Sequence, residues 1–290
     1  MARIRIGLAG WSYDDWRGDF YPPDLPRSRE LRYAARAFDS LEINGSFYSL
    51  RKPAHYRSWR AAAPRGFRYA VKGSRFITHN KKLHDADTAL ANFFASGVLE
   101  LREMLGPFLW QLPHNLTFDE PRLEAFLQRL PHDTEALAAM ARGHDRRVSG
   151  RSRVTNPDRN HRVRHVLEPR HESFFCAACV RLLRRHGVAL AFSDCRDWPF
   201  TEEITAGFVY LRLHGPAQPY ASPYGDQALD RWAERIQLWH RAEQPGDADR
   251  ITERVPPHRK ARDVYVYFDN DQHGHAPRNA RALRRRLGSP

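Results

Sequence analysis

Charged and amide side chains follow the short apolar runs of this sequence at the points where those runs end. Glu42 and Asn44 end one run, Lys72 ends the next, and Glu168 and Arg170 end a later one. A carboxylate held among cations is suited to general acid–base catalysis, because burial and neighbouring charges shift its pKa. We therefore predict catalytic roles for Glu42, Lys72 and Glu168.

A later run, residues 208–213, has a polar face. Tyr210, Arg212 and His214 alternate with Val209, Leu211 and Leu213, and a period of two places the polar residues on one side of a strand. An unpaired buried charge is costly. We therefore expect the buried charges to neutralise one another or a ligand in one network, comprising Glu42, Lys72, Glu168, Arg170 and Arg212.

Phosphate is the anion that these cations suit best, because the planar fork of arginine binds two oxygens of one phosphate group. Aromatic side chains near the same strand ends could stack on bases or sugars, or could simply cover the strand ends. A lone histidine such as His214 or His79 is as often a hydrogen-bonded structural residue as a ligand. The predicted substrate-binding set is Trp11, Asn44, Tyr48, Gln111, Arg170, Asp194, Arg212, His214 and Asn270.

Short β-rich runs alternate with amphipathic helical segments along the chain, as in a parallel sheet with crossover helices. Eight strands are predicted, at 4–9, 40–43, 68–72, 108–111, 163–168, 188–192, 208–213 and 264–268. Helices are predicted at 28–38, 53–62, 86–105, 120–130, 174–186, 226–241 and 277–287, and the crossover near 201–205 is too short for one. This pattern favours a single TIM-type (β/α)8 barrel, an α/β fold whose active sites lie at the carboxyl ends of the strands.

No linker divides the 290 residues, so we predict one domain over 1–290, with basic insertions at about 142–165 and 243–262. The formal net charge of +13 attracts polyanions in general. Charge runs are usually solvated surface, and a skew toward arginine can arise from genomic base composition. Whether the insertions bind nucleic acid stays open. The arginines of the first insertion are 142, 146, 147, 151, 153, 159, 162 and 164.

Three cysteines, Cys176, Cys179 and Cys195, cannot form a disulfide framework in a chain of this length. Cys176 and Cys179 open a helical segment with no second ligand pair, so we interpret them as structural. The first residues show no signal-peptide pattern, and no apolar run reaches the length of a membrane span. These features predict a cytoplasmic protein with no membrane association.

Metal-ligand residue types are present, but no spacing selects a site among them. Interleaved lysine and arginine oppose a bound cation. We therefore predict no cofactor and no obligatory metal, although a divalent ion is conceivable at some subset of Glu42, His79, Glu168, Asp194, His214, Asp269, Asp271 and His275.

Many of these motifs resemble successive blocks of the YecE-like family known as domain of unknown function 72. The matching segments are residues 7–13 (GLAGWSY), 42–48, 71–79 (VKGSRFITH), 111–113, 168–171, 210–215 and 264–271 (VYVYFDND). The resemblance covers essentially the whole chain and implies a TIM-type barrel, likened at fold level to nucleases such as endonuclease IV. Pro169 departs from the pattern and puts the geometry between Glu168 and Arg170 in doubt, because proline removes a strand donor. The 142–165 insertion is also longer than in compact members.

Three functions follow from these residues. The first is an enzyme that acts on a phosphate-bearing substrate, for example a hydrolase, with Lys72, Arg170 and Arg212 holding anionic oxygens and Glu42 or Glu168 moving a proton. The second is a lyase or isomerase of a small carbonyl or sugar compound that uses Lys72 as an amine. The third is a non-catalytic nucleic-acid-binding module. The oligomeric state is not indicated.

Overall fold

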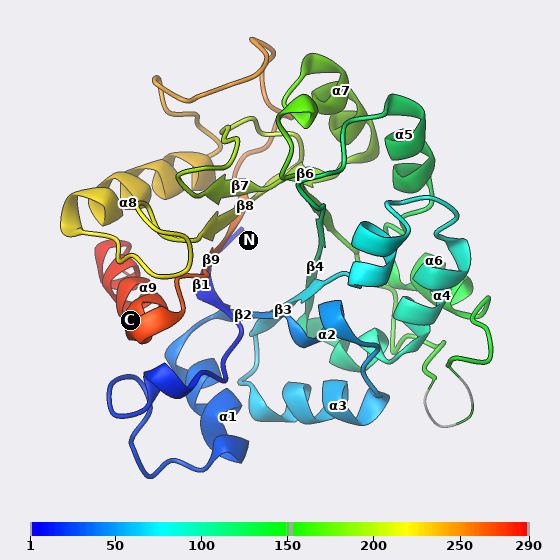
Figure 1. Cartoon of the computed structure of the whole chain (residues 1–290), viewed down its shortest axis with the longest axis horizontal. Coiled ribbons are helices and arrows are strands. Elements are labelled where there is room, and N and C mark those ends of the chain that lie inside the picture. Colours follow the sequence, from blue (N-terminus) through cyan, green and yellow to red (C-terminus); the bar gives the residue numbers. More distant parts are fainter. Residues whose placement is uncertain (1, 149, 151–152, 289–290) are drawn as a thin grey trace. The chain divides into compact units, whose positions relative to one another are not determined.

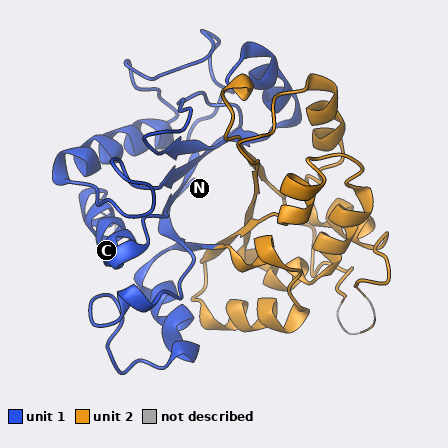
Figure 2. Cartoon of the chain, in the orientation of Figure 1, with its two compact units in different colours: residues 1–42, 175–290 blue, residues 43–174 orange. Residues whose placement is uncertain are grey.

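The computed structural model describes residues 2–148, 150 and 153–288, in which the chain forms two compact units (Figure 2). The first unit comprises residues 1–42 and 175–290, and the second comprises residues 43–174. Arg151 of the first basic insertion lies outside the described residues. The expectation of a single domain stays a prediction.

The fold class is α/β, a TIM-type barrel of parallel strands with surrounding helices, as predicted. The described residues contain nine strands rather than eight, because the predicted strand 188–192 is two short strands on either side of Ala191. At the break, the Leu190 N–H donates to the Thr205 hydroxyl at 2.8 Å. The strands are β1 (Ile4–Ala9), β2 (Ser40–Ile43), β3 (Arg68–Lys72), β4 (Leu105–Gln111), β5 (His165–Glu168), β6 (Ala189–Leu190), β7 (Phe192–Asp194), β8 (Phe208–Leu213) and β9 (Asp263–Phe268).

In the first unit, parallel strands follow the order β2, β1, β9, β8, β7. Its helices are α1 (Arg27–Ala37), α7 (Ala177–His186), α8 (Asp226–His240) and α9 (His275–Arg286), and Figure 1 shows α8 and α9 on the outer side of the strands. Helix α8 begins at Asp226, as predicted, and the residues it buries recur at helical spacing. They are Leu229, Ala233, Ile236 and Trp239.

In the second unit, β4 pairs in parallel with β3 and β5. Its helices are α2 (Gly45–Tyr48), α3 (Pro53–Ala62), α4 (Asp87–Ala95), α5 (Glu120–Gln128) and α6 (Thr134–Ala141). The prediction of one helix over 86–105 was wrong, because α4 ends at Ala95 and a 3-10 helix covers Val98–Met104. Gly97 between them has φ +123°, and a Cβ there would lie 2.6 Å from the Pro53 Cα. Only glycine fits this break.

Helix α6 was absent from the sequence prediction, which extended no element past residue 130 before the first insertion. Its start is fixed by Asp133, whose side chain accepts a hydrogen bond from the Ala136 N–H at 2.8 Å. An aspartate three residues before a helical N–H is a sequence-readable cap, so this helix could have been found.

Both basic insertions are tied to the folded units. In the first, the Asn92 side chain holds Asp145 through bonds of 3.1 and 2.9 Å, and the Val154 N–H donates to the Ala95 carbonyl at 2.8 Å. The segment 201–205 forms no helix, as expected, and it anchors the second insertion. Buried Glu203 accepts from the Thr252 N–H at 2.8 Å. These contacts therefore anchor each insertion to the unit that carries it.

His165 in β5 is buried and uncharged. Its Nδ1 accepts from the Trp110 indole at 3.1 Å, so the proton lies on Nε2, which donates to the Pro131 carbonyl at 2.7 Å. Burial lowers the pKa of His165 to about 3. Both ring nitrogens are satisfied only in the neutral form.

We predict that His165 makes the protein acid-sensitive. A folded-state pKa below the unfolded value gives stability that is fully present above about pH 6.5 and is lost as pH falls toward about 3. Between pH 7 and 5 this group should cost about 2 kcal/mol of the free energy of unfolding. Urea unfolding of His165→Gln should show a pH slope shallower by that amount. An unchanged slope would contradict the assignment.

Candidate functional site

Glu42 lies fully buried at the end of β2, in the first unit. Its Oε2 accepts the Tyr210 hydroxyl at 2.6 Å. Arg212 binds both carboxylate oxygens, with Nε to Oε2 at 3.2 Å and Nη2 to Oε1 at 2.8 Å. Alternation along β8 places Tyr210 and Arg212 on the same side, as predicted from their spacing. The two predicted charges Glu42 and Arg212 therefore meet.

Arg212 also binds a second carboxylate. Its Nη2 donates to the Asp269 Oδ2 at 2.8 Å, just past the end of β9. Its Nη1 lies 3.1 Å from the His214 Nε2, and because arginine can only donate, Nε2 is the acceptor and the histidine proton lies on Nδ1. That Nδ1 faces the Asp269 Oδ2 at 3.7 Å. A bound anion would compete with carboxylates for this guanidinium.

Asp271 and Tyr13 complete the first unit's cluster. The Tyr13 hydroxyl donates to the Ala9 carbonyl at 2.7 Å, and the Tyr13 side chain also hydrogen-bonds with Asp271, which by itself lowers the pKa of that carboxyl. Burial, and then the charge of Asp269, raises the pKa of Asp271 well above its usual value. The Asp271 Oδ1 has no hydrogen-bond partner among the described residues. A half-buried carboxyl with a raised pKa is suited to donate a proton.

Three more predicted residues belong to the first unit. Asp194 ends β7, and burial raises the pKa of its side chain. The Asn270 side-chain amide donates to Ser222 and Asn279, each at 3.0 Å, which ties a loop to α9. Trp11 is half-buried, and its carbonyl accepts from the Tyr21 hydroxyl. Their roles in substrate binding stay predictions, and the amide donors of Asn270 serve the protein's own structure.

Lys72 ends β3 in the second unit, and its Nζ lies 4.6 Å from the centre of the Phe47 ring. His79 packs edge-on against the same ring at 5.1 Å. Burial lowers the pKa of His79, and the charges of Lys72, Arg75, Arg170 and His114 lower it further. A histidine surrounded by cations marks an electropositive region. We name this group the basic cluster, comprising Lys72, Arg75, His79, His114 and Arg170.

Glu168 is the acidic partner of this cluster. It is fully buried at the end of β5, and its Oε1 accepts from the Arg170 Nη2 at 2.9 Å. Pro169 follows the last strand residue, and the neighbouring ladder bond from Leu112 N to the Glu168 carbonyl is 2.9 Å. The doubt about Pro169 was therefore unfounded, because the proline sits where β5 has ended. Gln111 faces Glu168 in the β4–β5 register.

Asn44 and Tyr48 flank the short helix α2. Asn44 is its N-cap, and the Asn44 Oδ1 is buried without a hydrogen-bond partner among the described residues. Tyr48 is 68% exposed. The Ser46 hydroxyl donates to the Lys72 carbonyl at 2.7 Å and so holds α2 against the end of β3. An unsatisfied amide oxygen beside the basic cluster is available to a ligand donor.

Among the residues that sequence reasoning left out of the site, Asp269 and Tyr210 contact predicted residues directly. Asp269 and Tyr210 bind Arg212 and Glu42 directly. Both had the right signal, since Asp269 directly follows β9 and Tyr210 shares the polar face of β8. Asp269 was considered only as a metal ligand.

Within the described residues, neither a metal-binding group nor a disulfide is formed. No group of three or more His, Cys, Asp or Glu side chains that could hold a metal ion occurs within residues 2–148, 150 and 153–288. The three cysteines are free thiols, and Cys176 caps α7 with Cys179 buried behind it. None of the described helices is both long and apolar enough to cross a membrane.

A parallel α/β barrel with ionisable residues at its strand ends is the class that these features define. The sequence model described as protein of unknown function DUF72 matches residues 5–290, and the chain belongs to this family. A 129-residue segment is 30% identical to the UPF0759 protein YecE of Escherichia coli K12 and covers 44% of each chain. The YunF protein of Bacillus subtilis is 28% identical over 79 residues, or 27% of each chain. The matched segments thus span less than half of these relatives.

Solved structures of the same family share the fold. A DUF72 family protein of Thermotoga maritima matches with a TM-score of 0.72 at 21% identity, covering 99% of both chains. One from Enterococcus faecalis matches with a TM-score of 0.70 at 16% identity, covering 99% of this chain and 96% of that one. Identities this low support the fold and leave the activity open.

We predict that Arg212→Met destabilises the protein by about 3–5 kcal/mol, because it leaves Glu42 and Asp269 buried without their cation. Adding Glu42→Gln to that variant should recover part of the loss, since one uncompensated charge disappears. Urea unfolding of the two single variants and the double variant measures this coupling. Strictly additive effects would show that the pair does not interact.

Asp271 should reduce stability at high pH. A carboxyl with a raised folded-state pKa gives stability that is present at low pH and lost as pH rises through that pKa. Asp271→Asn, which mimics the protonated form, should become more stable than the parent as pH increases, by about 1.4 kcal/mol for each unit of the shift. Unfolding from pH 5 to 9 tests this. The substitution Asp24→Asn, at an exposed position outside the cluster, serves as the control.

Proposed function

We propose that the protein is an enzyme that acts on a phosphate-bearing substrate, with the basic cluster of the second unit as the anion-binding site. The observation that carries the proposal is the gathering of basic side chains around His79, which shares the Phe47 ring with the Lys72 ammonium group. Burial lowers the pKa of His79, and the charges of Lys72, Arg75, Arg170 and His114 lower it further. Cations held this close repel one another. An anionic ligand would relieve that repulsion.

The geometry of individual residues supports an anion over other ligands. Glu168 holds the Arg170 guanidinium at one of its ends, at 2.9 Å, and so orients it. Arginine oriented by a carboxylate and a lysine beside it is a common way to hold phosphate oxygens.

Proton transfer is assigned to the carboxyl groups. The two predicted carboxylates, Glu42 and Glu168, are both fully buried and both bound to arginine. Asp271 differs because it is half-buried and its pKa is raised. We therefore add Asp271 to the proton-transfer candidates of the first unit, with Glu42 as the carboxylate that positions Arg212. In the second unit, Glu168 is the carboxylate that belongs to the basic cluster through its bond to Arg170.

The alternative functions have weaker support. A Schiff-base role for Lys72 needs a neutral amine, whereas the contact of Nζ with the Phe47 ring is one that an ammonium group makes. Nucleic-acid binding by the insertions needs unpaired charge. Arg147 pairs with Asp145 and Arg241 with Glu243 within or beside them. Borohydride trapping and salt titration would test the two alternatives.

We predict that Lys72→Met weakens the binding of inorganic phosphate about tenfold, because one charge-assisted contact is lost. Titration calorimetry at fixed salt measures the affinity. Lys260→Met is the matched control, since it removes an exposed lysine of the second insertion. Equal affinity in the parent and Lys72→Met would reject the basic cluster as the phosphate site.

A further inference from the structure

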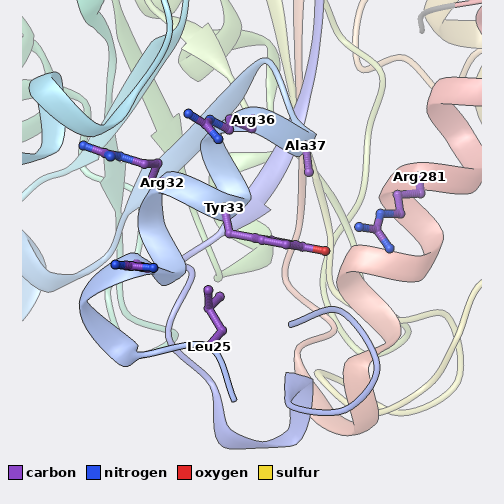
Figure 3. A pocket seen from close by; sticks show the side chains of 7 residues that line it. Leu25, Arg32, Tyr33, Arg36, Ala37 and Arg281 are labelled. Carbon is purple, nitrogen blue, oxygen red and sulfur yellow. The ribbon is translucent and has the colours of Figure 1, made fainter. Parts of the chain in front are cut away.

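A pocket on helix α1, in the first unit, is lined by other residues than the clusters described above. It has a volume of about 690 Å³, and none of its lining residues belongs to either cluster. Figure 3 shows Tyr33 and Arg36 of α1 on one side and Arg281 of α9 on the other. Its lining comprises Leu25, Arg29, Arg32, Tyr33, Arg36, Ala37 and Arg281.

Four guanidinium groups line this pocket and no carboxylate does. Among the described residues, none of the four has an ion-pair partner. The only acid of α1, Glu30, is buried and does not line the pocket, and it accepts from Arg17 at 2.6 Å and from Ser12 at 2.7 Å. Four unpaired cations around one concave surface repel each other and attract an anion of several charges.

Three acidic residues close to α1 and α9 are paired with arginines outside the pocket. Asp14 pairs with Arg27 at 2.5 Å, and Asp39 lies 3.7 Å from Arg284. Asp19 lies 3.3 Å from the Arg278 Nε. These carboxylates therefore neutralise arginines that do not line the pocket, and the charge of the lining arginines stays uncompensated.

The aromatic part of the pocket is held in place. Tyr33 is half-buried, and the Phe20 and Tyr21 rings contact it edge-on at 5.3 and 5.5 Å. The Arg281 guanidinium stacks over Phe20 at 4.7 Å. In Figure 3 the hydroxyl end of Tyr33 points toward Arg281. The packed Tyr33 ring offers a surface for a flat base, and the arginines around it offer contacts for phosphates.

We propose that this pocket binds a small ligand with a chain of phosphate groups, of the nucleoside triphosphate class. Arg29 and Arg36 are seven residues apart on one helix, roughly 10 Å along its axis, so a row of phosphates serves them better than a single phosphate does. The volume lies within the range of small-molecule sites. Leu25 and Tyr33 supply the apolar area that a base requires.

Titration calorimetry with ATP, inorganic triphosphate and AMP tests the proposal in the full chain. ATP should bind, AMP should bind much more weakly, and Arg32→Ala combined with Arg36→Ala should weaken ATP binding at least about tenfold. Arg60→Ala combined with Arg65→Ala, which removes two charges outside the pocket, should leave it unchanged. Tyr33→Leu should weaken ATP and spare inorganic triphosphate, since only ATP has a base to stack.

Each of the following results would overturn one part of the nucleoside triphosphate proposal. ATP binding that survives the Arg32 and Arg36 substitutions, or no binding at all, removes the pocket as a site. Equal binding of ATP and inorganic triphosphate, unaffected by Tyr33→Leu, removes the nucleoside and leaves inorganic oligophosphate as the source. A single-stranded oligonucleotide that displaces ATP at lower concentration would reject a small ligand. Lys72→Met should not affect this pocket, so failure here and failure of the basic cluster are separable.

Discussion

The Arg212 guanidinium neutralises two buried carboxylates, and the chemistry of the first unit depends on that one interaction. Glu42 at 2.8 Å and Asp269 at 2.8 Å share its Nη2 group. Without a cation at this position, β2 and β9 would each end in a carboxylate removed from water, which proteins rarely tolerate. The same guanidinium sets the proton of His214 on Nδ1 through its Nη1 contact. A single side chain thereby fixes charge, geometry and tautomer.

As a result, the carboxyl groups of this cluster differ: Glu42 and Asp269 are paired with Arg212, whereas the pKa of Asp271 is raised. Arg212 is already bound to Glu42 and Asp269, so it offers Asp271 limited compensation, and burial together with the Asp269 charge favours the protonated form. Neighbouring carboxyl groups with different protonation states are what acid–base chemistry requires. In the second unit basic side chains outnumber acidic ones, because Glu168 binds Arg170 while further cations gather around His79.

Sequence reasoning located the elements well where periodicity was unbroken. Helix α3 and strands β1, β2, β3 and β8 have the predicted bounds. It failed where one residue overrode the pattern. Gly97 divides a long apolar stretch that reads as one helix, because its positive φ and its contact with Pro53 are invisible to periodicity. The Leu190 N–H donates to the Thr205 hydroxyl where the sixth predicted strand is interrupted. These two residues are 15 positions apart in the sequence, so local periodicity does not reveal the contact.

The sequence by itself determined the fold class and the residue types at the strand ends, because alternation and strand spacing are local properties of the chain. It also determined that Tyr210, Arg212 and His214 share a face. Only the tertiary structure decided the partners. That Arg212 serves Glu42, 170 residues away, and that Asp269 competes for it, depends on strand register. The pocket between Tyr33 and Arg281 was likewise unreadable, since exposed arginines on two distant helices look like ordinary solvated surface until packing brings them together.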